Sequence, residues 1–336
     1  MVRESSTMNS QPLSQAAAPE SINWHASYVR HVAPKGGRFA LWKLNLILRL
    51  AVKHTYSYGF DVAAYRRKQA ELDPRLSKSD PSTSRSSADC NGVPAQWVDV
   101  PESRSDRVVL YIHGGAWFLS SPSLHHNMAA RLCRMIGARA LVVDYRLAPE
   151  HRFPAAIDDC WTTWRWLLAQ GVAAKDIVIA GDSAGGNLAL ALLHRINAAG
   201  DPMPACAALL SPLVDFTLSS PSLLTNEKSD PMFTSARAIG LRHLYISAEQ
   251  MLLPDASPLF ADFTGLPPLL FQSSESEVLR DESLRAAARA HAGGVTVEVE
   301  LWDGMPHVFQ AFSVLPQSEA GLRNIADFIR RHAGWT

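Results

Sequence analysis

Residues 177–193 read IVIAGDSAGGNLALALL, a β-branched run that passes through Gly-Asp-Ser-Ala-Gly directly into a helix-forming run. Strand, sharp turn and helix are the setting in which a G-x-S-x-G motif lifts a serine hydroxyl out of a sheet. Gly181 and Gly185 leave space where side chains would collide, and Asp182 completes the turn. The following helix points its amino end, with free amides, toward Ser183. The segment therefore predicts Ser183 as a candidate nucleophile.

Short β-rich runs alternate with helix-length segments on both sides of this motif, which predicts β-α units and a mostly parallel sheet. The expected strands lie at residues 97–100, 108–113, 140–144, 177–180, 207–210, 269–272 and 295–301. The expected helices lie at about 123–136, 155–169, 184–198, 281–292 and 316–332. The class is therefore α/β.

A loop rich in glycine follows the second expected strand, in the order His113-Gly114-Gly115-Ala116-Trp117. Two glycines let backbone amides approach a ligand closely. Amides of Gly114, Gly115 and Ala184 are therefore the predicted oxyanion hole, which would stabilise negative charge on a carbonyl oxygen under attack. His113 is interpreted as a brace for this loop.

Four blocks carry a resemblance to a known family: HGGAW at 113–117, DYRLAPEHRFPAAIDD at 144–159, GDSAGGN at 181–187 and GMPHVF at 304–309. In this order they resemble the bacterial hormone-sensitive-lipase-like esterases and lipases of the α/β-hydrolase fold. The resemblance implies an eight-stranded, mostly parallel sheet with helices on both faces and a helical cap. It also implies a serine carboxylester hydrolase for short- to medium-chain, uncharged esters. One departure is Ala116, which stands where the family usually has a third glycine.

The remaining catalytic candidates lie near the carboxyl end. His307 follows the last expected strand and is the predicted general base, in the chain order Ser, acid, His. Glu277 falls on the family's catalytic aspartate position, which is the second departure. Asp281 and Glu275 remain alternatives for the acid, because all three carboxylates follow the same strand. A lactonase, deacetylase or amidase would use the same groups, and a non-catalytic binding protein on this fold is the alternative of a different class.

The chain is expected to consist of a disordered tail at 1–20, an N-terminal cap segment at 21–72 and a catalytic domain at 73–336 with a cap insertion at about 213–255. Residues 71–95, rich in Ser, Pro, Asp and Gly, are expected to be a linker or long loop. An amphipathic helix is expected at about 38–54. It could lie on the body of the protein, cover an active site or attach to lipid.

Thirty-two basic residues balance thirty-two acidic ones, so bulk charge predicts no nucleic-acid partner. The amino-terminal region lacks the apolar core of a secretory signal, and no segment is long and apolar enough for stable membrane insertion. A cytoplasmic enzyme is expected, with a small-molecule ester as partner and no metal or organic cofactor. A homodimer is compatible with the sequence.

Overall fold

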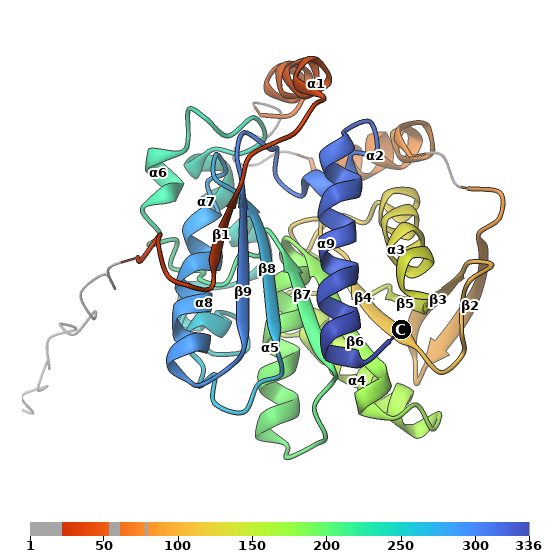
Figure 1. Ribbon diagram of the computed structural model, residues 1–336. Coiled ribbons are helices and arrows are strands. Elements are labelled where there is room, and N and C mark those ends of the chain that lie inside the picture. Colours follow the sequence, from red (N-terminus) through yellow and green to blue (C-terminus); the bar gives the residue numbers. More distant parts are fainter. Residues whose placement is uncertain (1–21, 54–60, 78–79, 336) are drawn as a thin grey trace, which may run out of the picture.

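The computed structural model describes residues 22–53, 61–77 and 80–335. The predicted disordered tail at 1–20 lies outside these residues. The described part of the chain forms a nine-stranded sheet with helices on both faces (Figure 1). Its strands, in chain order, are β1 (Val29–Val32), β2 (Ser84–Cys90), β3 (Val93–Asp99), β4 (Val108–Ile112), β5 (Arg139–Val143), β6 (Ile177–Asp182), β7 (Cys206–Leu210), β8 (Leu269–Ser274) and β9 (Val297–Trp302).

The sheet is mostly parallel, in the spatial order β1-β9-β8-β7-β6-β4-β5-β3-β2. Only the β5–β3 and β3–β2 pairs are antiparallel. Both faces are buried, because successive residues of a strand enter opposite cores. In β4, for example, Leu110 packs in the core on one side of the sheet and Tyr111 in the core on the other. That explains why the central strands β4 to β7 are mostly apolar in sequence.

The principal helices are α1 (Arg38–Ala51), α2 (Val62–Leu76), α3 (Pro122–Ile136), α4 (Ala155–Ala169), α5 (Ala184–Ala198), α6 (Ser222–Thr225), α7 (Ser235–Tyr245), α8 (Arg280–Ala292) and α9 (Pro316–Ala333). Single 3₁₀ turns lie at Ala174–Asp176, Ala248–Gln250, Pro258–Phe260 and Phe309–Ala311. Buried side chains of α4, α5 and α8 share one core with the sheet. Those of α3 and α9 form the core on the opposite face (Figure 1). The predicted three-layer α/β architecture is confirmed.

Two strands were not among those expected from the sequence, and the sheet has nine strands instead of eight. β1 lies within the segment predicted as a cap and pairs in parallel with β9 at the edge of the sheet. β2 lies within residues 71–95, so the expectation of a long loop there is wrong. Most of its side chains are exposed, which left no apolar pattern to detect, and backbone pairing with β3 holds it in place.

The turn between β2 and β3 has a sequence typical of a β-hairpin, although the composition of the surrounding segment suggested a loop. Its two-residue turn is Asn91-Gly92, and both residues have positive φ, at 57° and 88°. Asparagine and glycine adopt this conformation most readily, and an Asn-Gly pair is a strong indicator of a tight hairpin. The serine-rich composition upstream of the turn masked it.

Candidate active site

Ser183 lies between β6 and α5, at the carboxyl edge of the sheet. Its backbone has φ 54° and ψ −117°, a strained conformation for a residue with a side chain. The amide of Ser183 donates a hydrogen bond to the carbonyl of Leu210 in the neighbouring strand, at 2.8 Å. The strand, strained turn and helix predicted around this serine are therefore present.

Close backbone approach explains the two glycines of the motif. A Cβ atom on Gly181 would lie 2.4 Å from the carbonyl oxygen of Gly185. A Cβ atom on Gly185 would lie 2.0 Å from the carbonyl oxygen of Ile112. Both distances are far inside van der Waals contact, so any side chain would force the turn away from the neighbouring strand.

His307 and Glu277 meet through the loops that follow β9 and β8. Nδ1 of His307 lies 2.6 Å from Oε2 of Glu277, and the two side chains are only 4% and 0% exposed. The other oxygen of Glu277 accepts hydrogen bonds from the hydroxyl of Ser211, at 2.8 Å, and the amide of Ser274, at 2.7 Å. Nε2 of His307 is buried and has no hydrogen-bond partner among the described residues. The imidazole is therefore fixed through Nδ1, and its Nε2 has no hydrogen-bond partner in the described part of the chain.

The alternative carboxylates are engaged elsewhere. Asp281 accepts hydrogen bonds from the amide of Ser222, at 2.8 Å, and from Nε of Arg280, at 2.9 Å. Glu275 forms an ion pair with the ring of His31. Of the three candidates, Glu277 alone contacts His307.

Sequence reasoning missed Ser211, which supports the Glu277 carboxylate. Its hydroxyl is buried, donates to Glu277 and also accepts from the amide of Val308, at 3.3 Å. Ser211 directly follows β7, at the edge where Ser183 and Glu277 also lie. Position at the carboxyl end of a parallel strand was the signal that could have identified it.

The amides around the glycine-rich loop differ from the predicted set in one respect. The amide of Gly114 donates to Oδ1 of Asp182 at 3.1 Å, so it is occupied. The amides of Gly115, Ala116 and Ala184 donate to no group in the described residues. Gly115 and Ala116 have φ of 118° and 51°, which turns this part of the loop away from the strand direction. The structure thus leaves the amide of Ala116 available in place of the one on Gly114.

His113 lies beneath the loop in a buried polar cluster. Its Nδ1 contacts the carbonyl of Gly114 at 2.6 Å, and its own carbonyl accepts from the hydroxyl of Tyr145 at 2.8 Å. Burial, and then the nearby His125, lower the pKa of His113 to about 3, so the ring is neutral at working pH. These contacts fit the predicted bracing role.

Asp182 connects the serine turn to the same loop. Its Oδ1 accepts from the hydroxyl of Tyr111 at 2.7 Å and from the amide of Gly114, and its Oδ2 lies 3.7 Å from Nε2 of His125. Burial raises the pKa of Asp182, but the nearby His125 and the hydrogen bond from Tyr111 outweigh it, so the net pKa is lowered. The carboxylate is therefore a charged anchor for the loop.

Replacing Asp182 with alanine should lower the free energy of unfolding by about 3 kcal/mol, because the buried Tyr111 hydroxyl and Gly114 amide lose their acceptor. Urea denaturation followed by circular dichroism measures this loss. Asp182→Asn keeps one acceptor oxygen and should lose less. An Asp182→Ala variant within about 0.5 kcal/mol of the parent would contradict the anchoring role.

A small cavity of about 40 Å³ opens beside Ser183. Its described walls are apolar apart from Arg242, and they come from the glycine-rich loop, the region predicted as an insertion and the loop before α8. The lining residues are Ala116, Trp117, Ser183, Leu213, Phe216, Phe233, Ala238, Leu241, Arg242, Val278 and Leu279.

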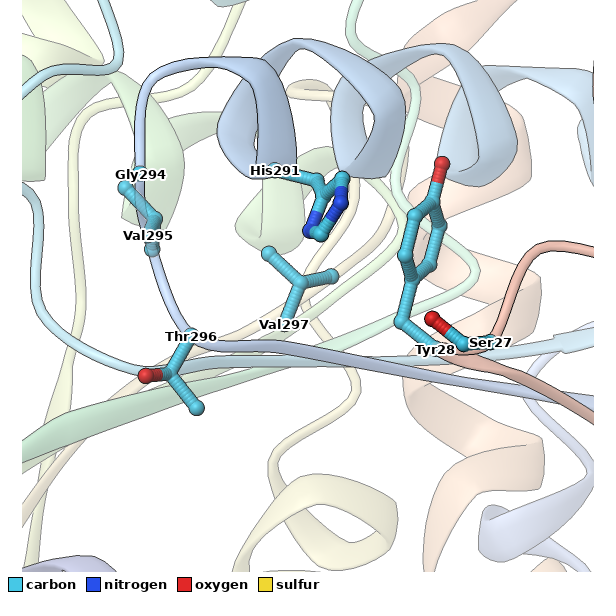
Figure 2. Close-up of a pocket in the computed structure, with 7 residues that line it drawn as sticks. All are labelled: Ser27, Tyr28, His291, Gly294, Val295, Thr296 and Val297. Carbon is cyan, nitrogen blue, oxygen red and sulfur yellow. The ribbon is translucent and has the colours of Figure 1, made fainter.

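A larger, open depression of about 410 Å³ lies at the opposite edge of the sheet. Figure 2 shows its lining, in which the rings of Tyr28 and His291 lie side by side, 4.7 Å apart. The depression lies beside the amino end of β9, whereas ligands in such sheets bind at the carboxyl ends of the strands. The depression is therefore not part of the candidate active site. In the described residues, no group of three or more His, Cys, Asp or Glu side chains is placed to hold a metal ion.

Comparison with known proteins agrees with this arrangement. The family model described as alpha/beta hydrolase fold matches residues 109–311. An esterase of Acinetobacter venetianus is 39% identical over 229 residues, covering 68% of this chain and 76% of that protein. An acetyl-hydrolase of Streptomyces hygroscopicus is 36% identical over 241 residues, covering 71% of this chain and 80% of that protein.

Solved structures of esterases are also similar to this chain. The crystal structure of an esterase from the bacterial hormone-sensitive lipase family aligns with a TM-score of 0.83 at 36% identity, covering 89% of this chain and 100% of that one. The likeness thus extends well beyond the four sequence blocks, into the N-terminal part of the chain. The chain belongs to the bacterial hormone-sensitive-lipase-like esterase family of the α/β-hydrolase fold.

Proposed function

We propose that this esterase cleaves short-chain, uncharged carboxylic esters through an acyl-enzyme intermediate on Ser183. The observation that carries the proposal is the 2.6 Å contact between His307 and Glu277, which leaves Nε2 of His307 buried and without a partner among the described residues. A histidine held in this way can take a proton from a serine hydroxyl.

In the first step, Oγ of Ser183 attacks the ester carbonyl carbon while Nε2 of His307 takes the hydroxyl proton. Glu277 accepts the hydrogen bond from Nδ1 and stabilises the resulting imidazolium. The carbonyl oxygen gains the negative charge, which the amides of Gly115, Ala116 and Ala184 would bind. Preorganised donors of this kind each contribute about 3 kcal/mol to a transition state.

The tetrahedral intermediate then collapses. The bond from carbon to the alcohol oxygen breaks, and His307 returns its proton to the departing alcohol. Water enters, loses a proton to the same Nε2 and attacks the acyl carbon. The bond between the acyl carbon and Oγ of Ser183 then breaks, and His307 returns the proton to Oγ as the acid leaves, so the cycle uses no cofactor.

The cavity beside Ser183 is the evidence for a substrate with a short acyl group. This cavity is small, at about 40 Å³, and its described walls are apolar apart from Arg242. Stacked aromatic rings behind it resist expansion: Trp117 lies 4.7 Å from Tyr245 and 4.8 Å from Phe216, between ring centroids. The acetyl-hydrolase among the relatives is consistent with this size.

Across p-nitrophenyl acetate, butyrate, octanoate and laurate, kcat/KM should be highest for one of the two shortest esters and fall at least about tenfold by octanoate. Emulsified triglycerides should be poor substrates for the same reason. Leu241→Ala enlarges the cavity and should raise the octanoate-to-acetate ratio about tenfold, whereas Leu252→Ala, outside the cavity, should not. A rising series from acetate to laurate in the parent enzyme would contradict the short-acyl assignment.

A further inference from the structure

The α1 helix presents an apolar stripe to solvent. Half of the large hydrophobic side chains found exposed in the described residues lie on this one helix: Phe39 (75% exposed), Trp42 (60%), Leu46 (40%), Ile47 (49%) and Leu50 (78%). Their spacing of three and four residues places them along one face. Scattered exposed hydrophobics are ordinary, but a continuous stripe marks an interaction surface.

The opposite face of α1 is already occupied. Leu41 and Leu44 pack against the small core formed by Trp302, Met305, Phe309 and Leu315. Polar contacts fix the helix further: the amide side chain of Asn45 donates to the carbonyl of Gly304, and Arg49 donates to the carbonyls of Lys228 and Ser229. One apolar face of α1 is therefore packed on the body of the protein, and the other is exposed in the described part of the chain.

The exposed charges of α1 itself and of the segment just before it are positive. Lys35, Arg38 and Lys43 are exposed and form no ion pair within the described residues. Residues 21–60 contain no aspartate or glutamate, although the whole chain is electrically balanced. Lys43, four residues after Phe39 and four before Ile47, lies within the stripe, and Lys35 and Arg38 lie at its amino end. An exposed apolar helix face that carries and adjoins cations is the pattern of a helix that lies in the interface of an anionic membrane.

A second copy of the chain fits this surface less well. A symmetric dimer would bring the same patch against itself, and with it Lys35, Arg38 and Lys43 against their own counterparts. Like charges at such an interface oppose association, whereas anionic lipid headgroups would neutralise them. The charge pattern thus favours lipid over self-association.

We propose that α1 is a docking surface for anionic phospholipid bilayers, with the Phe39, Trp42, Leu46, Ile47 and Leu50 stripe lying among the acyl chains near the headgroups. None of the helices in the described residues is long and apolar enough to cross a bilayer, so the attachment is peripheral. The helix lies above the carboxyl edge of the sheet, the edge that carries Ser183 and His307 (Figure 1). A docked molecule therefore turns its catalytic edge toward the lipid.

Co-sedimentation of the full chain with large unilamellar vesicles tests this proposal. Partition onto phosphatidylcholine vesicles containing about 30% phosphatidylglycerol should exceed partition onto pure phosphatidylcholine at least about tenfold, and the excess should shrink as salt is raised. Trp42→Gln combined with Leu46→Gln should reduce binding at least about tenfold, and so should Arg38→Glu combined with Lys43→Glu. Leu224→Gln combined with Leu252→Gln, which removes exposed hydrophobics outside α1, should bind as the parent does.

Thermal unfolding midpoints of all variants should match the parent, because the replaced side chains lie outside the core. Absence of binding to the anionic vesicles, or equal binding by the Trp42 and Leu46 variant, would overturn the proposal. It would also be overturned if light scattering found a dimer that this variant dissociates while vesicles do not bind. No ester is turned over in the measurement, so its outcome is independent of the esterase assays.

Discussion

Replacing Ser183 with alanine is expected to lower kcat for p-nitrophenyl acetate by at least about 10⁴-fold, with the fold unchanged. The loss is large because no other group can form the acyl-enzyme, and the oxyanion amides alone give only a small residual rate. Alanine carries the same Cβ as serine, so it should adopt the backbone conformation at position 183 at no greater cost. Steady-state kinetics with circular dichroism on the same preparation measure both expectations.

Ser86→Ala provides the matched control, since Ser86 is an exposed residue of β2 far along the sheet from the site. It should retain the parent rate within about twofold. Retention of more than about a tenth of the parent kcat by the Ser183 variant would show that another nucleophile carries the reaction.

Replacing Glu277 with glutamine should lower kcat by about 10³- to 10⁴-fold with little change in KM. Glutamine preserves size, but its amide group can donate toward Nδ1 of His307 and favour the wrong tautomer, with the ring proton on Nε2. The charge that stabilises the imidazolium is lost as well. Measurement of kcat and KM for p-nitrophenyl acetate separates this effect from a change in binding.

Asp281→Asn is the matched comparison, four residues further along the chain and equally buried. It should weaken the packing of α6 on α8, because Asp281 holds the amide of Ser222, while leaving kcat within about threefold. A greater loss of kcat in the Asp281 variant than in the Glu277 variant would contradict the acid assignment. Glu277→Asp should fall between the parent and Glu277→Gln, since the carboxylate is kept but withdrawn by one methylene.

The parts of the fold that were predictable are those where local pattern and tertiary burial agree. Strands β4 to β7 bury both faces and are mostly apolar, so their composition predicts them. The turn at Ser183 was predictable because its glycines meet a steric demand that only glycine satisfies. Edge strands β1 and β2 escaped detection because they are half exposed and held largely by backbone hydrogen bonds.

The details of the site depended on long-range contacts that spacing cannot reveal. The amide of Gly114 was indistinguishable from that of Gly115 until the Asp182 carboxylate was found bonded to it. Ser211 lies 66 residues from the carboxylate it supports, and its position after β7 does not reveal which side chain it contacts. The alternatives among Glu275, Glu277 and Asp281 likewise required knowing where the loop after β8 directs each side chain.

Arg66 shows how the N-terminal part of the chain bears on the site. From α2, its guanidinium donates to the carbonyls of Phe118 and Ala148, both at 2.6 Å, and pairs with Glu150 at 2.8 Å. Phe118 closes the loop that carries the amides of Gly115 and Ala116. The segment at 61–77 therefore supports the glycine-rich loop from outside the sheet.

The proposed mechanism requires Ser183 to be a nucleophile that His307 activates while Glu277 orients the imidazole ring. Labelling with a p-nitrophenyl organophosphonate ester, followed by intact-mass measurement and peptide mapping, tests it most directly. We expect one adduct per chain, located on Ser183, with labelling slowed at least about 10³-fold in His307→Ala. An adduct on any other residue, or undiminished labelling of Ser183 without His307, would contradict it.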